Sequence, residues 1–440
     1  MAADSETLTL TVEEKTPLLL GPQPTPLDLS LRRLESFLSI LGFNHSSSSI
    51  TFLLSFSAFL LLGVATPAAG IYLSWCSSSP SVDNCDSFQV DRFEIFSLVS
   101  EVSLAGLGLF CVSRNLSKYG TRRFLFVDQH HGQVDRFQKE YVTKIQDFFS
   151  LLSWWMLPCF IIKIAREIIR SVYIFRESIW RSVVVFLASV LSWSYLTTIF
   201  LSACILFNLV CNLQVIHFED YSKLLERESD ALVYLEEHVR LRYNLSKISH
   251  RFRIFLLMLF LFTSASQFVT LFQTTGYSEL VNFTNAGNLA VSSVVQVVGV
   301  VHCLHSASKI SHRAQGIASV ASRWHALVTC TSTNSSQMRG TNSSGNLEAL
   351  PPTSVVMDYS ESDLDLDSVE NITIQTNSQI VSYMSSYHKR QALVMYLQSN
   401  PGGITIFGWT VDRALVNTIF FIELSLVLFV LGKTVVFSAK

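Results

Sequence analysis

Seven hydrophobic segments, separated by connections that carry most of the charges, constrain this chain more than any other feature. The segments span residues 49–72, 93–113, 147–162, 182–212, 253–274, 288–306 and 414–436. The longer ones hold about 20 apolar-rich residues, which is what an α-helix needs to cross the hydrocarbon core of a bilayer. We therefore predict an all-α, seven-transmembrane helical protein whose surroundings are the lipid bilayer.

The composition supports this class and argues against several others. Only 15% of the 440 residues are charged, compared with about 25% in a typical globular domain. Lys and Arg lie in connections beside the hydrophobic segments and the formal net charge is −2, so we expect no nucleic-acid partner. The sequence has no GxSxG elbow, P-loop or HExxH motif, and its eight Cys show no zinc spacing. We expect no enzymatic activity, cofactor or metal site.

The distribution of basic residues predicts the orientation. Of the 32 Lys and Arg, 24 fall in the N-terminal tail and in the connections that share its side of the membrane, and eight fall on the other side. Lys and Arg favour the cytoplasmic side. We therefore predict a cytoplasmic N-terminus and an extracytoplasmic C-terminus, which argues against a G-protein-coupled-type receptor.

One connection departs from this distribution. Residues 163–181 (KIAREIIRSVYIFRESIWR) carry five basic residues on the predicted outer side. Ile and Val recur there at helical spacing, which predicts an interfacial amphipathic helix. The preceding span is short and contains Pro158, so a re-entrant segment is the alternative.

The chain divides into four regions by composition. Residues 1–48 form a predicted cytoplasmic tail, and residues 49–330 hold the first six spans together with amphipathic cytoplasmic helices. The clearest of these helices is residues 213–252, where apolar residues recur at i, i+3 and i+4. Residues 331–376 are rich in Ser, Thr and Asn with an acidic run, and we expect them to be disordered. Residues 377–440 hold a cytoplasmic helix and the last span.

Two carboxylates lie inside predicted spans. Glu101 is in the middle of the second span and Glu423 is in the middle of the seventh. Because a charge in a span costs at least about 2.5 kcal/mol, each needs a protein or water-lined environment. Each is either an interhelical hydrogen-bonding group or a group that lines a pore or pocket. The seventh span is polar on two sides, since Thr418 and Ser425 lie nearly opposite Glu423.

Aromatic and polar residues also gather in the outer halves of other spans. An apolar pocket with a few hydrogen-bonding groups is typical of small-molecule sites. The alternative is that these residues are interface aromatics or core packing. With Glu101, the predicted ligand pocket consists of Trp154, Trp155, Tyr195, Gln267 and Phe268.

Two cysteines and one glycosylation sequon lie in connections that are predicted to be extracytoplasmic. Cys76 and Cys85 flank a short polar loop, which predicts a disulfide if that loop faces an oxidising lumen. Two free thiols are the alternative. Asn282 begins the Asn-Phe-Thr sequon that the predicted orientation places in the lumen, where it could carry a glycan.

The N-terminal tail contains a short sorting pattern. Glu14 precedes Leu18 and Leu19 with the spacing of an acidic dileucine signal, which cytosolic sorting adaptors bind. Such a signal predicts an endosomal or vacuolar membrane, or cycling from the plasma membrane. A chance match is the alternative.

The end of the sequence resembles a plant family of seven-transmembrane proteins of unknown function that is described as gustatory-receptor-like. That family is distantly similar to the insect odorant and gustatory receptors, which are tetrameric ligand-gated cation channels with a pore lined by the last helix. The resemblance is carried by Gly408-Trp409, Asp412-Arg413, Thr418-Ile419-Phe420, Ile422-Glu423 and Gly432-Lys433-Thr434.

The resemblance implies an insect-chemoreceptor-like homotetramer that binds a small-molecule ligand. When the insect signature of the last helix is placed on Thr418, Ser425 stands where that signature has Gln, and Leu426 takes its final apolar position. Ile422 then matches a pore-facing position, and Glu423 is additional. These five residues form the predicted pore lining. The alternative function is a non-conducting signalling or scaffold protein that acts through its cytoplasmic helices.

Overall fold

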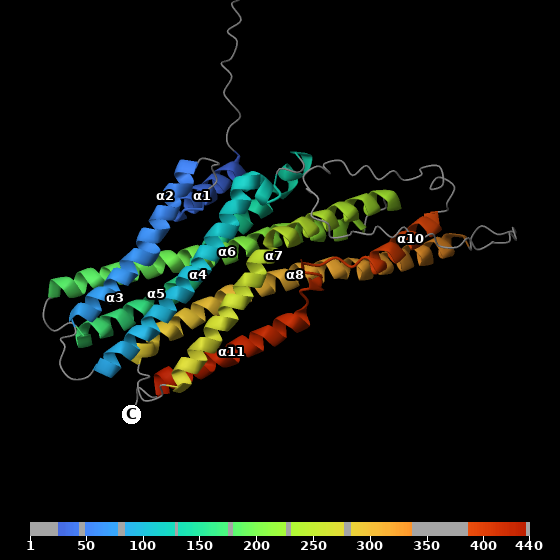
Figure 1. Ribbon diagram of the computed structural model, residues 1–440. Coiled ribbons are helices and arrows are strands. Elements are labelled where there is room, and N and C mark those ends of the chain that lie inside the picture. The colour runs from blue at the N-terminus through green and yellow to red at the C-terminus, as the bar shows by residue number, and fades with distance from the viewer. Residues whose placement is uncertain are drawn as a thin grey trace, which may run out of the picture.

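The computed structural model is built almost entirely from long helices (Figure 1). The parts of the chain that it describes are residues 25–43, 49–77, 84–127, 131–174, 179–225, 230–276, 283–336 and 386–436. In chain order the elements are α1 (Pro26–Leu41), α2 (Ser49–Phe59), the π-helical turn η1 (Leu60–Ala65), α3 (Thr66–Ser77), α4 (Asn84–Phe124), α5 (His131–Ile174), α6 (Ile179–Leu225), α7 (Ala231–Gly276), α8 (Phe283–Ser336), α10 (Ser386–Ser399), β1 (Thr405–Ile406), β2 (Trp409–Thr410) and α11 (Arg413–Val436).

Seven helical stretches in the described parts are long and apolar enough to cross a bilayer. Each of the seven predicted segments falls almost wholly within one of them, and the first stretch joins α2, η1 and α3. The prediction of an all-α, multi-pass membrane protein is therefore confirmed. The orientation of the termini stays a prediction.

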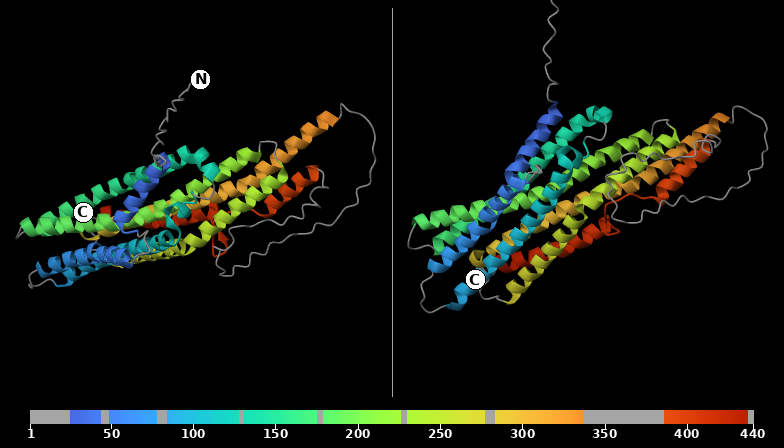
Figure 2. Two further views of the ribbon diagram at one scale, coloured as in Figure 1. Left: turned by 90° about the horizontal axis from the view of Figure 1, so that it is seen from above. Right: turned by 45° about the horizontal axis from the view of Figure 1, so that its top comes forward.

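The helices differ greatly in how far they are enclosed. α6 lies at the centre and packs against α4, α5 and α8, whereas α11 lies along one edge and packs against α7 and α8 (Figure 2). In their most hydrophobic stretches, 89% of the residues of α6 are buried, compared with 17% for α11. The rest of the surface of α11 is open to lipid or to another protein.

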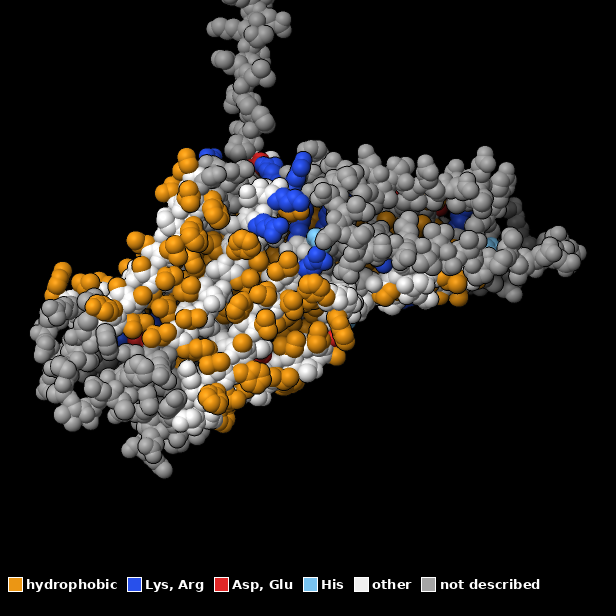
Figure 3. All heavy atoms as spheres, in the orientation of Figure 1, with side chains coloured by type: hydrophobic (Ala, Val, Ile, Leu, Met, Phe, Trp, Pro, Cys, Tyr) orange, Lys and Arg blue, Asp and Glu red, His pale blue; other side chains and the backbone are white. Residues whose placement is uncertain are grey.

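The helices α6, α7 and α8 continue beyond the apolar part of the bundle, and α10 lies along the extension of α8 (Figure 1). We call these three extensions the arms. The amphipathic segment 213–252 forms the end of α6 and the beginning of α7. Tyr221 donates to the backbone oxygen of Tyr234 over 3.0 Å, and Arg242 donates to Asn400 over 2.6 Å. Lys and Arg gather where the apolar surface meets the arms (Figure 3).

A short hairpin joins α10 to the last span. β1 and β2 are linked by Phe407 and Gly408, whose φ angles of 49° and 85° are those of the primed turn that suits a two-residue hairpin loop. Ser311 of α8 and Ser249 of α7 accept hydrogen bonds from backbone amides at the start of the hairpin. The beginning of α11 is thereby fixed to the two helices that α11 packs against.

The segment that follows the third span differs from its prediction. Residues 163–174 continue α5 without a break at Pro158, so an interfacial helix is wrong for this part, as is a re-entrant segment. The side chains of Lys163 and Arg166 are buried, at 3% and 1% exposure. Glu167 on α5 pairs with Lys163, and Glu94 on α4 pairs with Arg166. The spacing of residues within the segment did not reveal these partners.

Several predicted features fall outside what the structure describes, and they stay predictions. They are the sorting residues Glu14, Leu18 and Leu19, the sequon residue Asn282, the insert beyond Ser336, and the side chains of Cys76 and Cys85.

Candidate functional site

One face of α5 carries a row of charges inside the bundle. Lys163, Arg166, Glu167 and Arg170 recur at i, i+3, i+4 and i+7, so they share one side of the helix. We call these four residues the α5 charge row. They face α4, where Glu94 is also buried.

Ion pairs connect the charge row to α4 and α8. Arg166 lies 2.8 Å from Glu94 and 2.5 Å from Glu167, and Arg170 lies 2.9 Å from Glu94. Lys163 lies 3.1 Å from Glu167 and donates a hydrogen bond to the side chain of Asn288 on α8. Two carboxylates are thus shared among three cations. Burial of such charges is tolerated only because each has a partner.

Glu101 lies two turns beyond Glu94 on the same face of α4. Its carboxylate accepts a hydrogen bond from Ser97 over 3.3 Å, and Asn288 donates to the same Ser97 hydroxyl over 2.9 Å. The ion-pair network and Glu101 therefore belong to one polar region that joins α4, α5 and α8.

Two small cavities adjoin this region. The larger has a volume of about 50 Å³ and is lined by the α5 charge row, Glu94, Glu101 and residues of α3, α6 and α8 that include Ser192 and Trp193. The smaller, of about 10 Å³, lies between Glu101, Trp193 and Gln296. Sites for drug-sized molecules usually have about 300–1,000 Å³. The larger cavity therefore suits a few waters or a very small ligand.

The face of α11 that packs against the bundle is held in place by the carboxylate of Glu423. Glu423 is 4% exposed, and Ser264 of α7 donates a hydrogen bond to it over 2.8 Å. Val427 and Val430 are buried on the same side of the helix. In the single chain, Glu423 therefore links α11 to α7.

The outer face of α11 has a different character. Thr418, Ile422, Ser425 and Phe429 are all exposed, and at 3.6 residues per turn they fall within an arc of about 60°. The Thr418 hydroxyl donates to a backbone oxygen one turn earlier over 3.0 Å, and Ser425 does the same over 2.7 Å. This face combines hydroxyl and apolar groups but does not require water to satisfy its hydroxyls.

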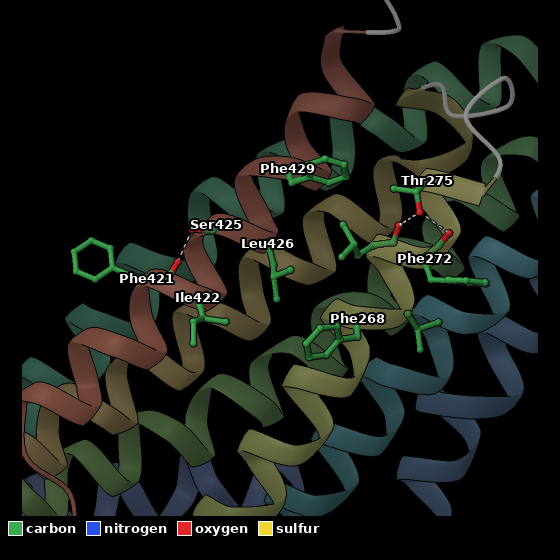
Figure 4. Close-up of a pocket in the computed structure, with 10 residues that line it drawn as sticks. Phe268, Phe272, Thr275, Phe421, Ile422, Ser425, Leu426 and Phe429 are labelled. Atoms are coloured by element: carbon green, nitrogen blue, oxygen red, sulfur yellow. Dashed lines mark hydrogen bonds between the residues drawn. The ribbon is translucent and has the colours of Figure 1, made fainter.

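A broad apolar groove of about 1140 Å³ separates α7 and α11 at residues 268–275 and 421–429 (Figure 4). Ile422 and Leu426 of α11 and Phe268 of α7 extend toward the space between the helices. Thr275 in the wall donates to carbonyls of its own helix. The groove is therefore suited to apolar groups, such as lipid chains or another helix.

The structure distributes the residues of the predicted ligand pocket over several places. Trp154 is 76% exposed, whereas the neighbouring Trp155 packs edge-to-face on the ring of His302. The Tyr195 hydroxyl donates to the backbone oxygen of Leu41 at the end of α1, over 3.4 Å. These aromatic residues lie apart from the cavity beside Glu101.

The other two predicted pocket residues also lie apart. Gln267 is fully buried and donates to the backbone oxygen of Ser293 over 3.4 Å, while Phe268 lines the groove beside α11. Of the six predicted residues, Glu101 alone lines the cavity beside the α5 charge row within the described chain.

Sequence reasoning missed the α5 charge row. Its signal was the spacing of Lys163, Arg166, Glu167 and Arg170, which places basic and acidic groups on one side of a helix that is apolar elsewhere. An outward-facing amphipathic helix has the same spacing. Only the partner carboxylate of Glu94, 72 residues away from Arg166, distinguishes the two.

A family described as "Protein of unknown function (DUF3537)" matches residues 29–422. The match begins in α1 and ends in α11, so it covers most of the chain. No curated protein matches the sequence. The chain belongs to the DUF3537 family.

Proposed function

We propose that this DUF3537 family member is a homotetrameric, ligand-gated cation channel in which α11 lines a central pore. The observation that carries the proposal is the position of α11. It is attached to the bundle along one stripe, and beside that stripe Thr418, Ile422 and Ser425 are exposed. The resemblance to insect chemoreceptors supports four copies around this face.

In such an assembly, Ile422 and Leu426 would form an apolar constriction that gates by dewetting, with the hydroxyl of Ser425 beside it. Glu423 would hold α11 against α7 through Ser264 rather than line the path. The hairpin would transmit movement of the arms to the start of α11, since it is bonded to both α7 and α8.

A second function is favoured by a different observation. Thr418 and Ser425 donate to their own backbone, and Glu423 accepts from Ser264, so each of these three side chains has a partner within one chain. A non-conducting signalling or scaffold protein would need no water path along this helix. Such a protein would bind partners through the arms and α10.

The experiment that separates these functions compares two cysteine variants of α11. Ile422→Cys and Leu428→Cys replace side chains that are 54% and 58% exposed and that lie about 120° apart on the helix. The full chain is reconstituted in a planar bilayer and treated with a charged methanethiosulfonate reagent, and the wild type serves as the background.

A channel lined by α11 predicts that the reagent reduces the current about tenfold or more in Ile422→Cys and leaves Leu428→Cys unchanged. Particle images should show four copies with α11 at the axis. The same response in both variants would contradict this pore lining. A monomer, or a tetramer without current under any stimulus, would favour the scaffold function.

We also propose that the protein resides in an endosomal or vacuolar membrane, or cycles from the plasma membrane, by way of adaptors that bind Glu14, Leu18 and Leu19. Replacement of both leucines by Ala should move a fluorescently tagged protein to another membrane. An unchanged distribution would discard the signal.

A further inference from the structure

We infer that a basic surface on α4 and α7 binds the phosphorylated headgroup of an inositol phospholipid in the surrounding membrane. The surface consists of Arg114, Lys118 and Arg123 of α4 together with Lys247 and Arg251 of α7. We call these five residues the boundary patch. The inference goes beyond the proposed function and does not depend on conduction.

The two helices of the boundary patch carry only basic charges over the stretches that meet there. Residues 102–127 contain four Lys or Arg and no Asp or Glu, and residues 238–276 contain five and none. The Asn115 side chain donates to the backbone oxygen of Arg251 over 3.2 Å, so the two stretches lie side by side. A cluster of Lys and Arg beside a membrane span is typical of proteins that bind anionic lipids.

Contacts with aromatic rings bring the cations of the two helices together. The Arg251 guanidinium lies 3.7 Å from the centre of the Tyr119 ring and 4.9 Å from that of Phe126. It also donates to the backbone oxygen of Arg123 over 3.3 Å. The Lys118 ammonium lies 5.2 Å from the centre of the same Tyr119 ring, so two cations converge on one ring. Arg251 is thereby oriented, and its planar guanidinium is suited to bidentate binding of phosphate.

The position of the boundary patch identifies a lipid as the partner. Phe110 of α4 and Ile254 of α7 are exposed apolar side chains of the spans. Phe110 precedes Arg114 by about one helical turn, and Ile254 follows Arg251 by three residues. The headgroups of the lipids that cover these apolar side chains therefore lie beside the cations, at the edge of the apolar surface where Lys and Arg gather (Figure 3). In the predicted orientation this is the cytoplasmic leaflet, which carries the anionic lipids.

The chemistry of the cations favours a phosphate monoester over the other anionic headgroups. Phosphatidylserine offers a phosphodiester and a carboxylate, but it also carries an ammonium group that Lys118 and Arg251 would repel. A phosphate monoester carries about 1.5 to 2 negative charges and three acceptor oxygens. It can therefore accept from Lys118 and Arg251 at once. The cations need not lack other partners for this, because each ammonium or guanidinium has several donors.

The test measures, by fluorescence polarisation, how a labelled short-chain phosphatidylinositol bisphosphate binds to the full chain in neutral detergent micelles. Saturable binding is expected. The unlabelled lipid should displace the probe about tenfold better than phosphatidylserine, because the monoester makes stronger charge-assisted hydrogen bonds. Equal displacement would contradict the choice of a monoester.

Absence of saturable binding would overturn the inference. It would show that carboxylates of the chain already neutralise the boundary patch, among them carboxylates outside the described residues such as that of Asp128.

Soluble inositol trisphosphate distinguishes a lipid site from a site for a free headgroup. The apolar side chains beside the boundary patch contact acyl chains only when the ligand is a lipid. The short-chain lipid should therefore displace the probe about tenfold better than inositol trisphosphate, through burial of apolar surface. Equal displacement by the two would overturn the assignment of a lipid.

Two matched variants locate the site. Arg114→Gln removes an exposed cation of the boundary patch and should weaken binding about fivefold, the effect of one charge near an anionic headgroup. Arg323→Gln is the control, because Arg323 is an exposed arginine on the arm of α8, next to Ser322, which accepts from Gln398 of α10. Equal binding by both variants, or equal loss in both, would overturn the location.

Arg251→Lys tests bidentate binding while the charge is retained. A lysine cannot present two parallel donors, so binding of phosphatidylinositol bisphosphate should weaken about fivefold or more. Thermal unfolding of the same sample checks that the variant is folded. Equal affinity in folded Arg251→Lys and in the wild type would contradict the role of Arg251. No current is measured here, so a silent protein that binds the lipid would disprove conduction alone.

Discussion

The helices α6 and α11 are almost equally hydrophobic by sequence, yet they occupy opposite environments. α6 is enclosed by α4, α5 and α8, with 89% of its most hydrophobic stretch buried, whereas 17% of the corresponding stretch of α11 is buried. Hydropathy reports transfer from water, and both lipid and protein interiors satisfy it. It therefore predicts that a helix lies in the membrane but not what surrounds it there.

The carboxylates of the two regions show the same contrast. In the interior, Glu167 contacts Lys163 and Arg166, which are themselves buried. At the edge, Glu423 depends on one hydroxyl, that of Ser264. The interior therefore holds its charges by mutual pairing, whereas the edge needs one hydrogen bond to attach a helix.

The largest expected effect comes from removing one carboxylate in each region. Glu167→Gln leaves buried cations with too little negative charge and should lower the free energy of unfolding by about 3–5 kcal/mol. Glu423→Gln keeps an oxygen that can accept from Ser264, so we expect a loss below about 1 kcal/mol. Thermal unfolding in nanodiscs measures both. Equal losses would mean that the α5 charge row is not enclosed as the structure shows.

An intermediate effect is expected from adding one methyl group in each region. A Cβ at Gly299 of α8 would lie 2.5 Å from the ring of Phe200 and 3.1 Å from the sulfur of Cys204. Gly299→Ala should therefore destabilise the protein by about 1–3 kcal/mol.

The matched change is Gly432→Ala on α11, where a Cβ would meet nothing within 4 Å. It should be neutral, or stabilise the protein by up to about 1 kcal/mol through helix propensity. Relative to the wild type, the unfolding temperature should fall in Gly299→Ala and stay the same or rise in Gly432→Ala. A destabilising Gly432→Ala would indicate that another chain covers this side of α11.

The smallest effect is expected at the first turn of α1, a helix that packs mainly against α5. Thr25 caps this helix by accepting from the Asp28 amide, and the Asp28 carboxylate accepts from Thr25 in return. Thr25→Ala should cost about 1 kcal/mol. A local probe on α1, such as hydrogen exchange, should detect fraying while α6 stays protected.

The same cap has a pH dependence. Hydrogen bonding from the Thr25 side chain is the main cause that lowers the pKa of Asp28, with the nearby Arg122 guanidinium adding to it. Because the folded pKa lies below the unfolded one, this contribution is present above the unfolded pKa and disappears as pH falls through the folded pKa. Thr25→Ala should reduce this acid sensitivity of α1. Unchanged acid sensitivity would assign it to another group.

Much of the fold could be predicted because its cause is local. A run of about 20 apolar residues must become a helix in a bilayer, since every backbone polar group needs a partner within the segment. The arms formed by α6 and α7 were likewise indicated by helical spacing in 213–252. The hairpin at Phe407 and Gly408 was not predicted. Its attachment to α7 and α8, which fixes the start of α11, depends on Ser249 and Ser311, and these are far away in the sequence.

The candidate sites were less predictable because their causes are not local. The sequence identified Glu101 and Glu423 as groups that need partners, but it did not identify Ser264 or Asn288 as residues near them. Lys163 looked like a residue of an outer loop until α8 and Glu167 enclosed it.

The sequence by itself determined that this chain forms seven membrane-spanning helices, because apolar length and backbone hydrogen bonding act within each segment. Only the tertiary structure decided that α6 is the core, that α11 is an edge with one uncovered face, and that the charges of α5 turn inward. The physical reason is that lipid and protein are similarly apolar. Packing between distant segments, and the pairing of charges that it permits, then decides which side of each helix is enclosed.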